Sequence, residues 1–223
     1  MEFSGNSLVN DANLVAYYKM ENANASVGTF NLTNTGGAPF NPAKFNNGVD
    51  FGSVNNAVYL GTANNLGMTG TTPITVTGWY KNQATVGTHP LFVHYSNTTA
   101  DRYFICYYVN NGVDIKLAID NSGFVELDYN IDLGTSDFWN LGFVRNGANG
   151  AKIYVNGALG TTNAAQGTVT GGANLTNIGF MPAIARYASF LIDDMTIFNR
   201  VLTDAEMASI YGQGHILSTN KYW

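Results

Sequence analysis

Short runs in which apolar and polar residues alternate recur along most of the chain. In one of them, alternate residues Ile74, Val76 and Tyr80 share one face of an extended strand. The pair Asn156-Gly157 follows another run and predicts a two-residue type I′ hairpin, because both residue types tolerate positive φ. The runs predicted as strands are 14–20, 48–51, 57–60, 74–81, 90–95, 102–109, 114–119, 124–129, 139–145, 152–155, 178–180 and 190–198. Many short strands separated by turn residues are typical of a β-sandwich or jelly roll.

One segment near the C terminus departs from this pattern. Residues 202–212 predict a short amphipathic helix, with Thr203 as the N-cap and Glu206 completing a capping box. Met207 begins its apolar stripe, and Gly212 is expected to end the helix. Because one helix is predicted beside about a dozen strands, the predicted fold class is all-β.

Composition limits the classes of partner. The 223 residues suit one sandwich domain, and apolar residues at 45% provide for a sizeable core. Charged residues make up only 11%, with a formal net charge of −5 and scattered Lys and Arg, which argues against nucleic acid and anionic membranes. We find no signal peptide and no run long enough to span a membrane. Low charge with abundant Asn, Thr and Gly favours an extracellular or virion surface. The single cysteine, Cys106, is expected to be a small buried hydrophobe.

Several segments, in their order along the chain, carry a family resemblance. They are 14–21, 48–52 with 57–60, 74–81, 139–145 with 152–157, and 192–203. Together they resemble the laminin-G-like, concanavalin A-like jelly rolls. The resemblance implies a jelly-roll β-sandwich of two antiparallel sheets with one short C-terminal helix. We expect an N-terminal extension over 1–12, the jelly roll over 13–213 and a tail over 214–223.

The sequence disfavours an enzyme. Glucanases of the wider superfamily carry a Glu-x-Asp-x-x-Glu strand, and the nearest approach here is Glu126-Leu127-Asp128, whose carboxylates share one face. The third acidic residue is absent, so a solvated strand face is the favoured interpretation. Three histidines lie in no nucleophile or metalloprotease motif: His89, His94 and His215.

Calcium is the metal that the resemblance implies, because related jelly rolls bind it at the sandwich rim through oxygen ligands. By that resemblance the expected ligands are Glu21, Asn22 and Asp194. The alternative is that Asp193 or Asp194 caps a turn or pairs with Arg200.

A glycan site requires an exposed aromatic face beside polar side chains. The residues predicted to supply it are Tyr95, Asn97, Asp101, Tyr103 and Asn121. The alternative for such tyrosines is a half-buried sheet face. The sequence therefore predicts a non-catalytic recognition or adhesion module that binds a glycan or surface polysaccharide, with calcium as a stabilising ion. The competing hypothesis is a structural virion protein, such as a capsid decoration or tail-associated jelly roll, whose partners are neighbouring proteins.

Overall fold

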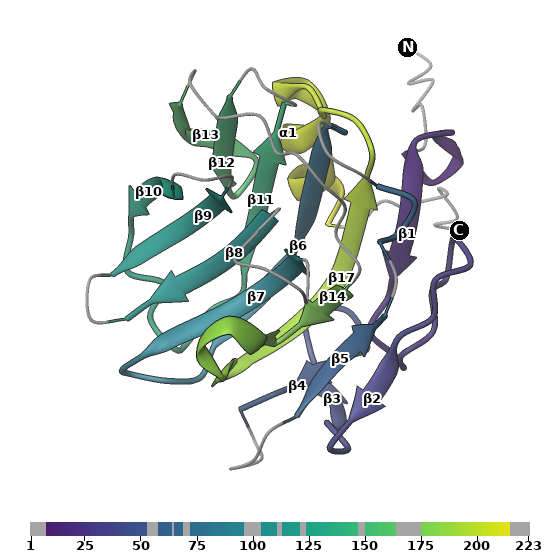
Figure 1. The fold of residues 1–223 in the computed structure, drawn as a ribbon, viewed down its shortest axis with the longest axis vertical. Coiled ribbons are helices and arrows are strands. Elements are labelled where there is room, and N and C mark those ends of the chain that lie inside the picture. Colours follow the sequence, from purple (N-terminus) through teal and green to yellow (C-terminus); the bar gives the residue numbers. More distant parts are fainter. Residues whose placement is uncertain are drawn as a thin grey trace.

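Two antiparallel sheets packed face to face make up the protein (Figure 1). The structure is a computed structural model and describes residues 8–52, 58–63, 65–68, 72–95, 104–110, 113–120, 124–146, 150–163 and 175–214. Within this part of the chain, one sheet has eight strands and the other seven. The predicted jelly-roll sandwich is confirmed.

The eight-stranded sheet, sheet A, has the order β13-β12-β11-β6-β17-β4-β3, and β1 also pairs with β17. Its strands are β1 (Leu14–Tyr18), β3 (Phe40–Pro42), β4 (Asn47–Asp50), β6 (Ile74–Asn82), β11 (Trp139–Arg145), β12 (Ala151–Val155), β13 (Ala158–Asn163) and β17 (Phe190–Phe198).

The seven-stranded sheet, sheet B, has the order β10-β9-β8-β7-β14-β5-β2. Its strands are β2 (Thr33–Thr35), β5 (Tyr59–Thr62), β7 (Thr88–Tyr95), β8 (Phe104–Val109), β9 (Asp114–Asp120), β10 (Phe124–Asn130) and β14 (Leu175–Ile178). A small hairpin of β15 (Phe180–Met181) and β16 (Arg186–Tyr187), joined by the 3-10 turn η2 (Pro182–Ile184), contacts β7. It lies in front of sheet B in the view of Figure 1.

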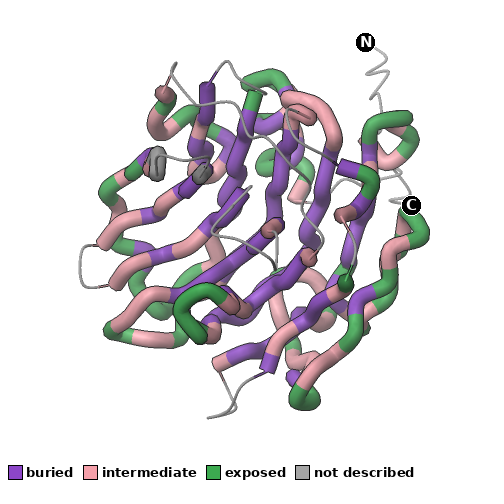
Figure 2. The backbone as a smooth tube through the Cα atoms, viewed as in Figure 1, coloured by how far each residue is buried: buried purple, intermediate pink, exposed green. Residues whose placement is uncertain are grey.

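The main core fills the space between the sheets. Ile74, Val76 and Tyr80 of β6 all belong to it, so the predicted alternation is confirmed. Cys106 of β8 also points into this core and is fully buried, as expected. Figure 2 shows the central strands as buried and most of the exposed backbone in the loops and in the β15–β16 hairpin.

The predicted helix is α1 (Asp204–Gln213), and its capping box is present. The Thr203 side chain accepts a hydrogen bond from the Glu206 backbone N–H, and Glu206 in turn accepts one from Thr203 N–H. The stop is two residues later than predicted, because Gly214 adopts φ 82° and its N–H bonds to the Tyr211 carbonyl. Gly212 therefore lies inside the helix.

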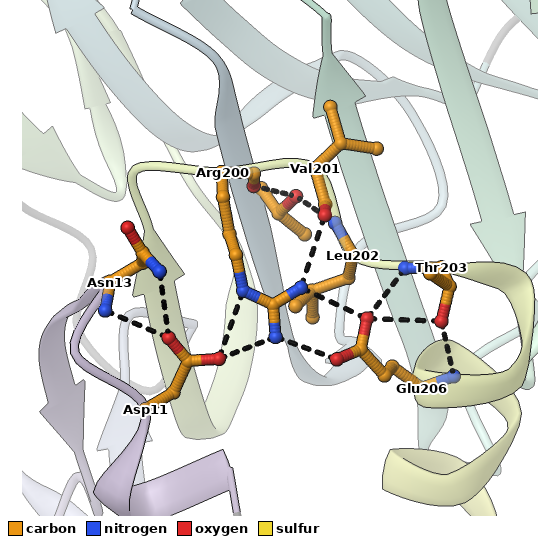
Figure 3. Close-up of polar contacts among 8 residues, drawn as sticks. Asp11, Asn13, Arg200, Val201, Leu202, Thr203 and Glu206 are labelled. Carbon is orange, nitrogen blue, oxygen red and sulfur yellow. Dashed lines mark hydrogen bonds and ion pairs between the residues drawn. The ribbon is translucent and has the colours of Figure 1, made fainter.

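An ion-pair network ties the N-terminal segment to this helix (Figure 3). The guanidinium of Arg200 donates to Asp11, 2.9 Å from Nε, and to both carboxylate oxygens of Glu206, at 2.6 and 3.0 Å. Asp11 also accepts from the backbone N–H of Asn13. Arg200 thus pairs with Asp11 and Glu206 and not with Asp193 or Asp194, so the ion-pair part of the alternative interpretation is wrong.

Residues 8–12 were assigned to an N-terminal extension. In the structure they include a 3-10 turn, η1 (Leu8–Asn10), whose Leu8 and Val9 pack against the apolar cluster under α1. The asparagine-glycine turn between β12 and β13 is also as predicted, since Asn156 and Gly157 adopt φ 49° and 76°. Residues 215–223 of the predicted tail lie outside the described residues.

Candidate functional site

The outer face of sheet B carries a row of apolar side chains that ends in a charge. Strand register places Val93 opposite Ile105, Ile105 opposite Ala118, and Ala118 opposite Glu126. Directly opposed residues point to the same side of a sheet, so these four form one line across β7, β8, β9 and β10. Met181 of the hairpin packs on its apolar end.

A second line runs beside the first and is polar. Tyr107 lies opposite Lys116, and Lys116 lies opposite Asp128. The two lines border a hollow of about 260 Å³ that we call the sheet-face hollow. Its lining residues are Thr88, Ile105, Tyr107, Val109, Lys116, Ala118, Glu126, Met181 and Ile184.

Lys116 connects the charged groups of the hollow. Its Nζ lies 2.6 Å from Glu126 Oε1 and 3.1 Å from Asp128 Oδ1. The Tyr107 hydroxyl donates to the other oxygen of Glu126. Both carboxylates therefore share one ammonium group, which lies between them.

The pKa values of the two carboxyl groups are shifted in opposite directions. Burial alone would raise the pKa of Glu126, but the hydrogen bonds from Lys116 and Tyr107 outweigh it and lower that pKa. Burial and the neighbouring Glu126 charge raise the pKa of Asp128, despite its contact with Lys116. Burial opposes the charge on Lys116, but its two acidic partners raise its pKa overall, so it stays positive near neutral pH.

Of the predicted glycan-binding residues, Tyr95 is the one that the structure describes. It is half-buried on β7 and packs against the apolar cluster of Val93, Ile105, Ala118 and Met181. The last three of these residues line the hollow. Four others lie outside the described residues: Asn97, Asp101, Tyr103 and Asn121. Lys116 and Glu126 were not predicted as binding residues, because their adjacency to Tyr107 depends on strand register.

A second group of interest is acidic and lies on the outer side of sheet A. A β-bulge interrupts the pairing of β17 with β6 between Asp193 and Thr196, and Asp194 adopts φ 50° there. Consecutive strand residues normally face opposite ways, and the bulge brings both aspartates to the outer side. Aspartate is among the residues that tolerate this positive φ.

These aspartates have few partners. The Tyr17 hydroxyl donates to Asp194 Oδ1 at 2.5 Å, and the Phe45 backbone N–H donates to Asp193 Oδ2 at 2.7 Å. Asp193 Oδ1 and Asp194 Oδ2 are buried and have no hydrogen-bond partner among the residues that the structure describes. Burial, together with the charges of Asp194 and Glu21, raises the pKa of Asp193 to about 8. Burial and Glu21 raise the pKa of Asp194 to about 6, although the Tyr17 bond lowers it.

The predicted calcium ligands are thus partly brought together. Glu21 lies close enough for its charge to act on both aspartates, and its Oε1 accepts a 3.4 Å hydrogen bond from Asn47 N–H. The Asn22 side chain instead accepts from the Asn24 backbone N–H in a local turn. Across the described residues, no three His, Cys, Asp or Glu side chains cluster as a metal site. Two unpartnered carboxylate oxygens are suitable donors for calcium, which fills its shell with carbonyls and water.

A third feature is a polar cavity of about 280 Å³ at the end of the sandwich, where the loops after β6, β8 and β10 meet. Its lining residues are Asn82, Ala84, Thr85, Tyr108, Asn110, Val113, Asp132, Gly134 and Thr135. The Asn82 amide is used by the backbone of Ala84, and Tyr108 is buried. This loop-end cavity offers hydrogen bonds but no exposed ring.

Two reactive groups that the structure describes, His94 and Cys106, are buried. Burial and the Arg145 charge lower the pKa of His94 to about 3, so it is neutral near pH 7 and cannot shuttle a proton there. Burial also raises the pKa of the Cys106 thiol, which keeps it protonated. His215 lies outside the described residues. No helix that the structure describes has the length and apolarity to cross a bilayer.

The family is shown by a sequence comparison. Residues 51–208 match the model of the concanavalin A-like lectin/glucanases superfamily, and the chain belongs to that superfamily. A comparison with curated proteins found no match.

Solved structures share the fold at low sequence identity. Domain 4 of AbnA, a GH43 extracellular arabinanase from Geobacillus stearothermophilus in complex with arabinotriose, is 18% identical with a TM-score of 0.74, over 89% of this chain and 98% of that one. The botulinum neurotoxin serotype G binding domain is 13% identical with a TM-score of 0.69, over 91% of this chain and 51% of that one. The botulinum neurotoxin DC binding domain in complex with rat synaptotagmin II is also 13% identical, with a TM-score of 0.69, over 93% and 52%. The chain thus spans about half of each toxin domain.

Proposed function

We propose that this chain is a non-catalytic glycan-binding module and that the sheet-face hollow is its binding site. The observation that carries the proposal is the pairing of the half-buried Tyr107 ring with hydrogen-bonding groups of Thr88, Lys116 and Glu126 around one hollow. Sugar rings pack on aromatic faces while their hydroxyls bond to such groups. The similar arabinanase domain carries bound arabinotriose, which supports a carbohydrate ligand.

The same geometry argues against hydrolysis. A glycosidase needs two carboxyls on either side of the scissile bond, with one protonated as the acid. Here the ammonium group of Lys116 lies between Glu126 and Asp128 and bonds to both. Each oxygen of Glu126 accepts one hydrogen bond, from Tyr107 or from Lys116, and these bonds favour the ionised form of Glu126 over the protonated acid. This arrangement suits recognition, in which fixed charges orient hydroxyl groups.

We also propose that calcium stabilises the module through Asp193 and Asp194, with Glu21 contributing negative charge. The support is the buried, unpartnered oxygens Asp193 Oδ1 and Asp194 Oδ2. A divalent cation would offset the cost of burying these two carboxylates in their ionised form. An extracellular or virion-surface location remains a prediction from composition.

The test is a glycan array with the full chain, followed by calorimetric titration of the best ligand. We expect Tyr107→Ala and Lys116→Met each to weaken binding at least about ten-fold, since each removes a main contact of the hollow. Tyr211→Ala is the matched control, because Tyr211 is an exposed tyrosine on α1, over the opposite sheet.

Three outcomes are informative. Loss of binding in the hollow variants alone supports the proposal. Loss in Thr135→Val alone would move the site to the loop-end cavity, which that residue lines. A blank array would reject glycan binding and favour a protein partner, as in the virion hypothesis.

A further inference from the structure

The sheet-face hollow is more apolar than a site for hydroxyl groups alone requires. Five of its nine lining residues are aliphatic or thioether side chains: Ile105, Val109, Ala118, Met181 and Ile184. Tyr107 is its one aromatic ring, so most of the apolar wall cannot stack on a sugar face. Aliphatic walls of this kind suit a small apolar group such as a methyl.

Ile184 makes this wall accessible to a ligand. It lies at the end of η2, and 48% of its surface is exposed. Isolated exposed aliphatic residues are common on protein surfaces. Ile184 is not isolated, because it lines a hollow whose other walls are mostly apolar.

The turn that holds Ile184 is closed by a hydrogen bond and slightly strained. Pro182 begins it, and Ala185 ends it in the left-handed region at φ 47° and ψ 52°, with its N–H bonded to the Pro182 carbonyl at 3.2 Å. Left-handed conformation in a non-glycine residue costs free energy and is often retained where a side chain must be positioned. Ile184 is therefore held in place before a ligand arrives.

The charges of the hollow select against anions. Lys116 is the one cation among the described residues that line it, and it is already paired with Glu126 and Asp128. One positive and two negative groups leave the cluster net negative, in a chain whose formal net charge is −5. A sugar carboxylate or sulfate would meet repulsion from Glu126 and Asp128.

The volume of the hollow matches one sugar unit. At about 260 Å³ the hollow is just below the roughly 300 Å³ at which drug-sized sites begin. A single sugar ring with one small substituent is the size that this space accommodates.

We propose that the sheet-face hollow binds a neutral sugar that carries a methyl group, supplied either by an N-acetyl substituent or by a 6-deoxy position. The methyl packs on Ile184, Met181 and Ala118, while the hydroxyls bond to Lys116, Glu126 and Thr88. This selectivity rests on the glycan-binding function proposed above and adds the ligand class to it.

The experiment compares matched sugars by calorimetry or ligand-observed NMR: N-acetylglucosamine against glucose, D-fucose against D-galactose, and sialic acid as the acidic probe. We expect at least one methyl-bearing sugar to bind about four-fold or more tightly than its partner, which is the gain from burying one methyl group. The two pairs distinguish the N-acetyl source from the 6-deoxy source. Sialic acid should bind more weakly than the preferred neutral sugar.

Ile184→Ser should weaken binding of the methyl-bearing sugar more than binding of its unsubstituted partner, so that the preference within the pair is lost. Leu159→Ser is the matched control, because Leu159 is also exposed, at 43%, and does not line the hollow. Equal binding within both pairs would overturn the methyl selectivity. A preference for sialic acid, which also carries an N-acetyl group, would overturn the selection against anions. Either outcome would leave glycan binding standing. Failure of every sugar to bind would overturn both the selectivity and glycan binding.

Discussion

The Tyr17 hydroxyl on β1 donates a 2.5 Å hydrogen bond to Oδ1 of Asp194 on β17, and the two strands are neighbours in sheet A. Asp194 is buried, and its other carboxylate oxygen has no partner. Tyr17 is thus the donor that stabilises its ionised form. The bond joins two residues that are 177 positions apart in the chain.

Tyr17→Phe should destabilise the fold more at pH 7.5 than at pH 5. A hydrogen bond to a charged group contributes about 1.5–3 kcal/mol, and that charge is present only above the Asp194 pKa of about 6. Urea unfolding at the two pH values, in chelator, measures the difference. An equal loss at both would mean that the hydroxyl contributes through packing alone.

Without divalent cations, the wild-type chain should become less stable as pH rises from about 4 to about 8. Burial raises the folded-state pKa values of Asp193 to about 8 and Asp194 to about 6, both above their ordinary value of 3.8. In that window the folded state binds more protons than the unfolded state, so their contribution is full below 3.8 and is lost as pH rises. The melting temperature in chelator across this range tests the sign, and Asp193→Asn should flatten the curve.

Calcium should reverse that loss. At pH 8 a concentration one hundred times its dissociation constant would stabilise the fold by about 2.7 kcal/mol. Asp194→Asn should abolish the thermal shift yet fold normally, because asparagine has the same shape and also tolerates the positive φ at this position. Asp204→Asn, an exposed acid on α1, should keep the shift. A wild-type melting temperature insensitive to calcium would reject the proposed ion.

Short sequence motifs correctly predicted the features of the fold that depend on neighbouring residues. The capping box of Thr203 and Glu206 and the turn at Asn156-Gly157 are both present, because each depends on residues close together in sequence. The β15–β16 hairpin was missed, since strands of two residues carry no periodicity.

The candidate site could be predicted only in part. Tyr107, Lys116 and Glu126 are brought together by the register of three strands, and a shift of one residue would turn any of them inward. The sequence therefore indicated that Glu126 is a possible catalytic acid, but it did not indicate that Glu126 pairs with Lys116. The Asp193-Asp194 pair could be recognised in the sequence. The β-bulge at these residues and the hydrogen bond from Tyr17 could not be predicted, because both depend on tertiary contacts.

Arg200→Met should cost about 1 kcal/mol or more at pH 7, since it breaks a network of two acids and one guanidinium rather than an isolated pair. Hydrogen bonds from Arg200 are the main cause that lowers the pKa values of Asp11 and Glu206, so this contribution is present above their ordinary values and is lost as pH falls below them. The cost should therefore shrink at pH 3. Lys152→Met is the control: Lys152 forms a more exposed ion pair with Asp204, and its loss should cost less than about 0.5 kcal/mol. Similar losses for both variants would show that the network adds nothing beyond a surface pair.

Gly157→Ala should destabilise the fold by about 2–4 kcal/mol, because it combines backbone strain with a clash. Gly157 has φ 76°, and a Cβ there would lie 2.8 Å from Tyr211 Cβ and 3.0 Å from Ala208 Cα, both in α1. The hairpin turn and the helix would have to separate, since neither contact is the end of a flexible side chain. Gly134→Ala is the matched control: its φ is 54°, and no atom lies within 4 Å of the added Cβ, so strain alone remains at about 1 kcal/mol. Chemical denaturation of both variants gives the difference between them, which is the contribution of the contact with α1. Equal losses would mean that α1 moves without cost and is only loosely held on sheet A.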